Sequence, residues 1–111
     1  MEKYSEKLLE KKLRERCKDY GALALKFTSS TYTGLPDRLI LLPDRTVLWV
    51  EVKTTGQKLS PEQATRKKML ERRGHTVYVV DDLDSLALVL VEVKEYAMRY
   101  RETQYLGGRR G

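Results

Sequence analysis

Two short segments of the sequence carry side chains that can do chemistry on a phosphodiester bond. The segment 34–38, Gly-Leu-Pro-Asp-Arg, presents the carboxylate of Asp37 directly after a glycine and a proline that shape the backbone. The segment 50–53, Val-Glu-Val-Lys, combines the carboxylate of Glu51 with the ammonium of Lys53. Carboxylate oxygens bind divalent cations, and an ammonium stabilises charge that develops on a phosphate. These residue types predict a site that holds a cation and activates a water.

The spacing of the two segments predicts that they meet on one hairpin. A strand over 47–54 alternates its faces, so Glu51 and Lys53 point the same way. A turn near 43–46 then brings Asp37 roughly opposite the 51–53 end of that strand. A lone Glu-x-Lys on an exposed strand is most often a solvated ion pair worth under about 1 kcal/mol. The hairpin partner Asp37 is what favours a shared cation over that structural interpretation.

Hydrophobic periodicity and turn residues predict the elements that carry these groups. Ser60, Pro61 and Gln63 form a capping box that starts a helix, and Gly74 ends it. Asp84 or Ser85 caps a last helix whose first half is apolar almost all round. We expect helices over 2–20, 61–73 and from about 84 to 100, and strands over 22–30, 39–42, 47–54 and 76–80. A single domain over 1–105 and a disordered tail over 106–111 complete the expected organisation.

The first helix supplies a third candidate acid. Leu9, Leu13 and Cys17 recur at helical spacing and mark its buried stripe. At about 100° per residue, Glu6 falls within roughly 30° of the stripe, and Glu10 lies farther out on its flank. We therefore expect Glu6 to face the body of the domain. A glutamate at a helix edge with its carboxylate in water shows the same pattern, so periodicity alone does not assign a catalytic role.

Composition limits the setting and the partners. The 111 residues carry 22 Lys and Arg against 16 Asp and Glu, a net charge of +6, which favours a polyanionic partner such as nucleic acid. Cys17 is the only cysteine, so a disulfide or thiolate zinc site within one chain is excluded and a reducing cytosol is expected. Neither a signal peptide nor a membrane span is expected. His75 is the only histidine, and we do not expect it to act as a base.

Basic side chains near the predicted site are candidates for contacts to DNA phosphates. Each of them singly is more often an ordinary solvated charge. The candidates are Lys26, Lys58, Arg66 and Lys67, with Lys68 beside them.

These motifs together resemble a known family. Pro36-Asp37, then Glu51-Val52-Lys53, preceded by a helical Glu and followed by the segment 59–63, Leu-Ser-Pro-Glu-Gln, are similar to the VRR-NUC domain of the PD-(D/E)XK nuclease superfamily. The resemblance covers about residues 1–90. It implies an α/β fold with an αβββαβ restriction-endonuclease-like core, a mixed central sheet flanked by helices, and an additional C-terminal helix.

The resemblance also implies roles for the site residues. Asp37, Glu51 and the backbone carbonyl of Val52 would bind Mg²⁺ or Mn²⁺, and Lys53 would orient the attacking water or stabilise the phosphate. No nucleotide cofactor is implied.

Two helices would add side chains to this site. Glu6 matches the helix-borne acid of the family, and Glu10 is a second match one turn on. Gln63 matches a glutamine that the family places beside the same site.

The implied activity is metal-dependent, structure-selective cleavage of DNA. Stand-alone proteins of this kind come from phages and bacteria and resemble homodimeric Holliday junction resolvases, enzymes of recombination and repair, so the expected location is the cytoplasm of a bacterial or phage-infected cell. Leu88, Val89 and Val91 fit a dimer contact, although a wider core explains them as well. Flap, nicking or restriction-type cleavage and a non-catalytic basic nucleic-acid-binding module remain as alternatives. Clustered carboxylates disfavour the module, because they repel phosphate.

Overall fold

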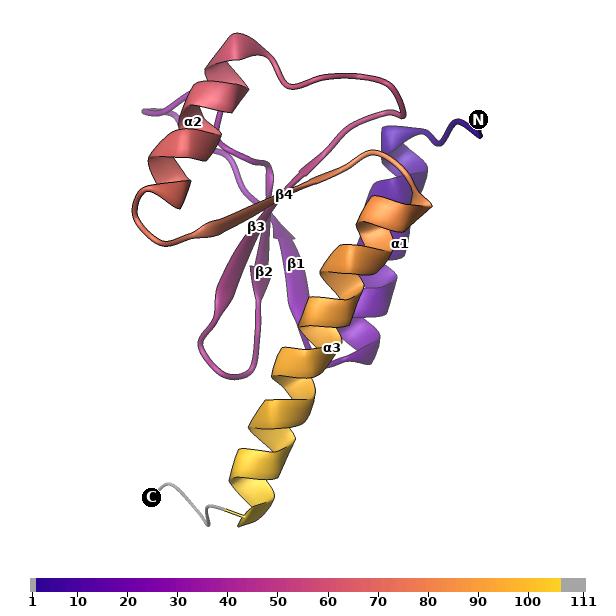
Figure 1. Ribbon diagram of the computed structural model, residues 1–111, viewed down its shortest axis with the longest axis vertical. Coiled ribbons are helices and arrows are strands. Elements are labelled where there is room, and N and C mark those ends of the chain that lie inside the picture. The colour runs from indigo at the N-terminus through magenta and orange to yellow at the C-terminus, as the bar shows by residue number, and fades with distance from the viewer. Residues whose placement is uncertain (1, 107–111) are drawn as a thin grey trace.

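The computed structural model describes residues 2–106, which form three helices and one four-stranded sheet (Figure 1). Strands lie in the order β1-β2-β3-β4; β1–β2 and β2–β3 are antiparallel, and β3–β4 is parallel. This is the mixed αβββαβ arrangement with a C-terminal helix that the resemblance to the VRR-NUC domain implies. The elements are α1 (Glu6–Asp19), β1 (Leu23–Lys26), β2 (Arg38–Leu41), β3 (Val47–Val52), α2 (Pro61–Glu71), β4 (Thr76–Val80) and α3 (Leu83–Leu106).

The β2–β3 hairpin sets the geometry of the site. Its turn closes with the Leu42 N–H donating to the Thr46 carbonyl at 3.0 Å, and Arg45 adopts a left-handed φ of 75°. In the ladder, Arg38 pairs with Val50. Continuing that register by one residue places Asp37 opposite Glu51. The predicted hairpin and its register are therefore confirmed.

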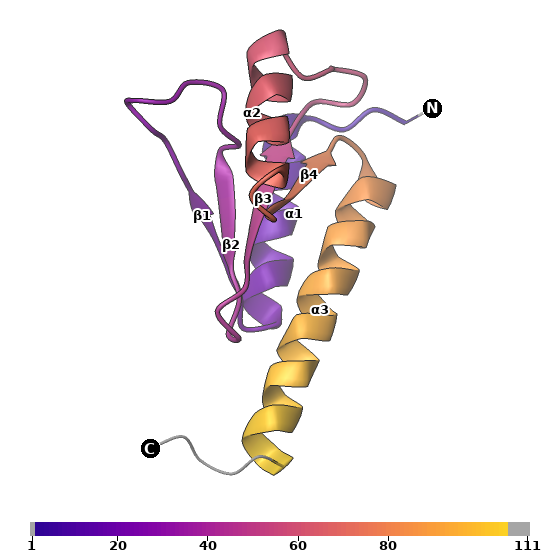
Figure 2. The same ribbon diagram turned by 60° about the vertical axis from the view of Figure 1, so that its left-hand side comes forward.

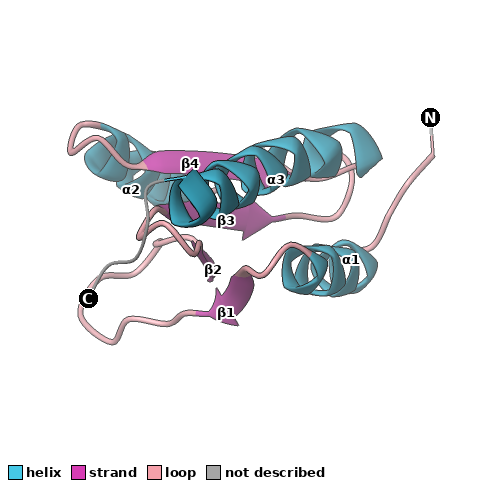
Figure 3. Cartoon of the chain, turned by 90° about the horizontal axis from the view of Figure 1, so that it is seen from below, coloured by secondary structure: helices cyan, strands magenta, loops and turns pink. Residues whose placement is uncertain are grey.

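One face of the sheet packs against α1 and α3, while α2 lies on the other side (Figures 1 and 3). Alternation along β3 sends Leu48, Val50 and Val52 into the core and directs Trp49 and Glu51 to the α2 side. The buried core comprises Leu9, Leu13, Cys17, Ala22, Ile40, Leu42, Leu48, Val50, Val52, Val80, Leu86, Val89 and Val93.

Helix α2 starts with the predicted capping box. The Ser60 hydroxyl accepts from the Gln63 N–H at 3.1 Å, and the Gln63 side chain accepts from the Ser60 N–H at 2.9 Å. These reciprocal bonds satisfy two backbone donors at the helix start. The helix ends at Glu71, two residues short of the expectation, and Gly74 follows with a φ of 85°.

Several expected boundaries are wrong by a few residues. Helix α1 begins at Glu6 and not at residue 2, because Ser5 is its N-cap and accepts from the Leu8 N–H. Strand β1 is confined to Leu23–Lys26, since the polar chain after it leaves the sheet. Helix α3 begins at Leu83, where the Asp82 carboxylate accepts from the Ser85 N–H at 2.7 Å. The disordered tail was expected over 106–111. Leu106 is instead the last residue of α3, and residues 107–111 lie outside the described residues.

Apolar side chains are exposed on two separate surfaces. Leu23, Leu25 and Leu41 lie on the sheet face that points away from the core, and Leu23 pairs directly with Leu41. Leu88 and Val91 are exposed on α3. Val89, expected to share a dimer contact with them, is instead fully buried in the core, because helical spacing aligns it with Leu86 and Val93. Among residues 2–106, no helix is both long and apolar enough to cross a membrane.

Candidate metal centre

The hairpin brings together two carboxylates, of which Glu51 is buried and Asp37 is partly buried. Asp37 immediately precedes β2 and lies opposite Glu51 on β3. Glu51 is only 5% exposed. One oxygen of each carboxylate, Asp37 Oδ1 and Glu51 Oε1, is buried and has no hydrogen-bond partner within the described part of the chain. Buried carboxylate oxygens are normally paired, so these two are candidates for ligands of a cation.

Burial and crowding raise the pKa values of both acids. Burial is the larger cause at Glu51, where it and the nearby Asp37 charge raise the pKa to about 7. Lys53 acts in the opposite direction and lowers the pKa of Glu51. The pKa of Asp37 is also raised, first by burial and then by the charge of Glu10. Charging both acids is therefore unfavourable unless a cation is present.

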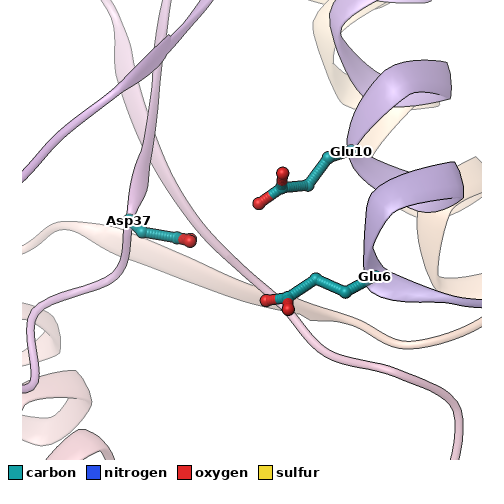
Figure 4. A group of neighbouring side chains, drawn as sticks. All are labelled: Glu6, Glu10 and Asp37. Atoms are coloured by element: carbon teal, nitrogen blue, oxygen red, sulfur yellow. The ribbon is translucent and has the colours of Figure 1, made fainter.

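Helix α1 adds two further acids to this pair. One carboxylate oxygen from each of Glu6, Glu10 and Asp37 lies within 4.8 Å of the others. In Figure 4 the two glutamates extend from α1 toward Asp37, which points back at them from the chain before β2. The structure thus brings both candidate helix-borne acids to the site.

The expectation that Glu6 faces the body more than Glu10 is wrong. Glu6 is exposed, whereas Glu10 is partly buried. Periodicity gives the direction in which a side chain leaves a helix, but it does not say what lies there. Glu6 is the first residue of α1, while Glu10, one turn farther along, meets Arg38 at the start of β2.

Arg38 is a buried residue that sequence reasoning missed. It is 7% exposed, and its Nη2 lies 3.4 Å from Glu10 Oε2 while Nη1 donates to the Ala24 carbonyl at 3.3 Å. This guanidinium therefore connects α1, β1 and β2 beside the acids. The sequence contained a signal for this residue. Arg38 lies two positions before the core residue Ile40 and therefore on the same, buried face of the strand, where a charged side chain needs a partner.

Two threonines, which follow Lys53 after the end of β3, hold the start of α1 in place. The Thr55 hydroxyl accepts from the Tyr4 N–H at 2.8 Å and donates to the Asp81 carbonyl. The Thr55 N–H donates to the Tyr4 carbonyl at 3.0 Å, and the Thr54 hydroxyl accepts from the Glu6 N–H at 3.3 Å. Sequence reasoning missed both residues, since their role depends on a chain segment far away in the sequence.

The predicted backbone ligand and the lysine lie at the end of β3. The Lys53 N–H donates toward β4, to the Val80 carbonyl at 2.8 Å. Backbone groups of successive strand residues alternate in direction, so the Val52 carbonyl points the other way, toward the β2 side, beyond the last ladder pair of Arg38 and Val50. Lys53 is partly buried and close enough to Glu51 to lower its pKa.

The remaining predicted site residues lie on α2, in the loop before it and at the end of β1. Gln63 uses its side-chain oxygen in the capping box. Arg66 donates to the Thr33 carbonyl, and Lys67 pairs with Glu71 at 2.9 Å, so both have partners within the protein. Lys58 is exposed in the loop before α2, and Lys26, at the end of β1, is close enough to Asp37 to lower its pKa.

The donor set fits a hard divalent cation. Every candidate ligand is an oxygen, from Asp37, Glu51, the α1 glutamates or the Val52 carbonyl, and Mg²⁺ and Mn²⁺ prefer oxygen ligands. Two of these oxygens are buried without a partner among the residues described. A cation would satisfy them and remove the repulsion that raises their pKa values.

The fold is that of a PD-(D/E)XK-like α/β domain, and comparisons with known proteins specify the family. The model of the VRR-NUC domain matches residues 1–82, so the chain belongs to the VRR-NUC domain family. A relative named "Putative nuclease p44", from Acyrthosiphon pisum secondary endosymbiont phage 1, is 38% identical over 76 residues, which are 68% of this chain and 82% of the relative. A solved structure described as a VRR_NUC domain aligns with a TM-score of 0.73 and 27% identity, over 78% of this chain and 96% of that one.

Proposed function

We propose that this protein is a metal-dependent endodeoxyribonuclease that hydrolyses phosphodiester bonds. The observation that carries the proposal is the pair of buried, partnerless oxygens of Asp37 and Glu51 beside two acids from α1. A protein that only bound DNA would gain nothing from carboxylates that repel phosphate. The net charge of +6, the family and the name of the phage relative agree with a nucleic-acid substrate.

In this proposal Asp37, Glu51 and the Val52 carbonyl hold Mg²⁺ or Mn²⁺, and Glu6 or Glu10 supports them. When bound, the cation supplies Lewis-acid stabilisation of the phosphate and lowers the pKa of a bound water. The Lys53 ammonium stabilises the negative charge that develops on the phosphate during attack.

The proposed substrate is branched DNA, with a four-way junction as the first choice. Symmetric resolution of a junction cuts two strands, and the described chain contains one acidic centre, so the proposal includes a homodimer. The exposed apolar surfaces on the sheet and on α3 are its candidate contacts. Lys26 and Lys58 are proposed to contact phosphates near the site.

The test is a cleavage assay of the pure protein on labelled four-way junction, flap and linear duplex of matched sequence. Each substrate is incubated with Mg²⁺, Mn²⁺ or EDTA, and Asp37→Asn is run beside the wild type. We expect symmetric junction cuts with either metal, none in EDTA, and at least a hundredfold loss of rate in the variant, about 3 kcal/mol of transition-state stabilisation. If the flap is cut faster than the junction, flap DNA becomes the proposed substrate in place of the four-way junction. Cutting by Asp37→Asn at the wild-type rate would show that the centre is elsewhere.

A further inference from the structure

The chain between β1 and β2, residues 28–36, leads directly into Asp37. The ends of this segment are held together, because the Phe27 N–H donates to the Asp37 carbonyl at 2.7 Å. Between these ends the segment passes beside α2 (Figure 2). Helix α2 is therefore in a position to influence a proposed metal ligand that it does not itself carry.

Arg66 of α2 contacts this segment through both the edge and the plane of its guanidinium. Its Nε donates to the Thr33 carbonyl at 2.8 Å. The guanidinium carbon lies 5.0 Å from the centroid of the Tyr32 ring, and Nη1 lies 3.8 Å from Met69 Sδ. The hydrogen bond fixes the backbone of the segment and the ring contact fixes a side chain next to it.

Gly34 makes a second contact to α2, directly beside the first. It has a φ of +82°, and a Cβ at this position would lie 2.7 Å from Glu62 Cγ and 3.0 Å from the Glu62 backbone. Only glycine permits both this conformation and this approach. The buried Pro36 then restricts the chain before Asp37. The backbone between Thr33 and Asp37 therefore has little conformational freedom, so a contact at Thr33 also affects the position of the Asp37 carboxylate.

We infer that Arg66 is a positioning residue, which holds segment 28–36 against α2 so that the Asp37 carboxylate is in place to bind the cation. This inference rests on the proposed function, because it takes Asp37 as a metal ligand. Groups that orient metal ligands from outside the coordination sphere typically contribute about 10- to 100-fold in metal affinity. Arg66 would therefore act on metal affinity and not on DNA affinity.

The test measures Mn²⁺ affinity by calorimetry for wild type, Arg66→Ala, Arg66→Lys and Tyr32→Ala. The matched control is Arg73→Ala, because Arg73 lies just after α2 and its guanidinium donates to the Met69 carbonyl of that helix at 2.9 Å. We expect Arg66→Ala and Arg66→Lys to bind Mn²⁺ at least about tenfold more weakly, Tyr32→Ala to show a smaller loss, and Arg73→Ala to match wild type. Removing a positive charge should by itself strengthen cation binding, so the loss cannot be a charge effect.

DNA binding in EDTA separates positioning from a direct phosphate contact. A positioning residue leaves this affinity and its salt dependence unchanged, whereas loss of a phosphate contact weakens binding and reduces the salt slope by about one. Wild-type Mn²⁺ affinity in Arg66→Ala and Arg66→Lys overturns the inference. A wild type that binds Mn²⁺ but cuts no DNA overturns the proposed cleavage activity, whereas the metal site and this inference stand. A wild type that binds no Mn²⁺ overturns both.

Discussion

Glu51 and Asp37 are acids whose surroundings oppose their ionisation. Burial and the neighbouring Asp37 raise the pKa of Glu51 from 4.5 to about 7. Between these two values Glu51 binds more protons in the folded protein than in the unfolded chain, so its contribution to the free energy of unfolding falls as pH rises from about 4.5 to 7 and stays low above it. In the metal-free protein, Glu51 therefore destabilises the fold least where it is protonated.

Glu51→Gln removes this penalty, because the amide is neutral at every pH. In EDTA at pH 8 we expect the variant to be more stable than wild type by on the order of 2 kcal/mol, with the difference vanishing near pH 4.5. Thermal unfolding across that pH range measures it. Equal melting temperatures of the two proteins at pH 8 in EDTA would contradict the assigned environment of Glu51.

Lys53 should affect the rate of cleavage more than metal binding, since an ammonium cannot ligate a cation but stabilises charge on phosphate. We expect Lys53→Ala to cut at least a hundredfold more slowly, about 3 kcal/mol, while retaining Mn²⁺ affinity within a few-fold. Single-turnover cleavage and calorimetry provide the two measurements. Lost metal affinity with unchanged turnover would refute this role.

The structure reverses the expected ranking of the two α1 glutamates. Arg38 holds the Glu10 carboxylate near Asp37, whereas Glu6 is exposed and must be ordered when it binds. We expect Glu10→Gln to slow cleavage at least about tenfold more than Glu6→Gln. Melting temperatures must accompany the rates, because Glu10→Gln leaves the buried Arg38 without its charged partner. A larger loss in Glu6→Gln would return the role to that residue.

For single residues, the sequence alone identified the two acids of the hairpin. It could not decide which of the two glutamates of α1 lies closer to the body of the domain. Period-two alternation and a short turn are local rules, and they suffice to place Asp37 opposite Glu51. The difference between Glu6 and Glu10 depends on Arg38, which reaches α1 from a different part of the chain. No rule that considers one helix at a time contains that contact.

Among the elements, α1 has its start held by the Thr55 hydroxyl, in the chain that follows β3. Thr55 is 7% exposed and joins the chain before α1 to the end of β4. Thr55→Val keeps the shape of the side chain but leaves the Tyr4 N–H without its partner, so we expect a loss of about 1–3 kcal/mol in unfolding free energy. We expect Thr55→Ser to restore most of this loss. Urea unfolding measures it, with Thr76→Val on the exposed start of β4 as control; equal losses in the two valine variants would argue against the role of Thr55.

The bounds of an element could be predicted from the sequence where neighbouring residues determine them. The α2 capping box and the glycine after that helix were both predicted, since caps depend on residues next to each other. Val89 was misplaced because the first half of α3 is apolar on several sides. Helical spacing therefore allows more than one buried stripe, and packing against the sheet selects the one that contains Leu86, Val89 and Val93. Strand β1 ends at Lys26 for a similar reason, because residues 32–34 farther along the chain contact α2, which is distant in the sequence.

For the whole molecule we predict a homodimer at micromolar concentration. Leu23, Leu25 and Leu41 adjoin on two paired strands and form the more continuous exposed apolar surface, while Leu88 and Val91 form a smaller one on α3. We therefore expect Leu25→Lys to shift the protein to a monomer and Leu88→Lys to leave the dimer intact, as measured by light scattering. The reverse result would place the contact on α3. A monomer mass for wild type, both free and on junction DNA, would exclude the resolvase mechanism.

The strands lie in the sheet in the same order as in the chain, and this order has a consequence for how the cation site forms during folding. A hairpin closed by a short turn needs only a small loop, so Asp37 and Glu51 can meet early. Glu10 reaches them only after α1 has docked across a longer loop. A chain that folds without a cation must therefore bring the carboxylates of Asp37 and Glu51 together against their mutual repulsion. In a chain that folds with a cation present, the hairpin already gains from binding the cation before α1 has docked.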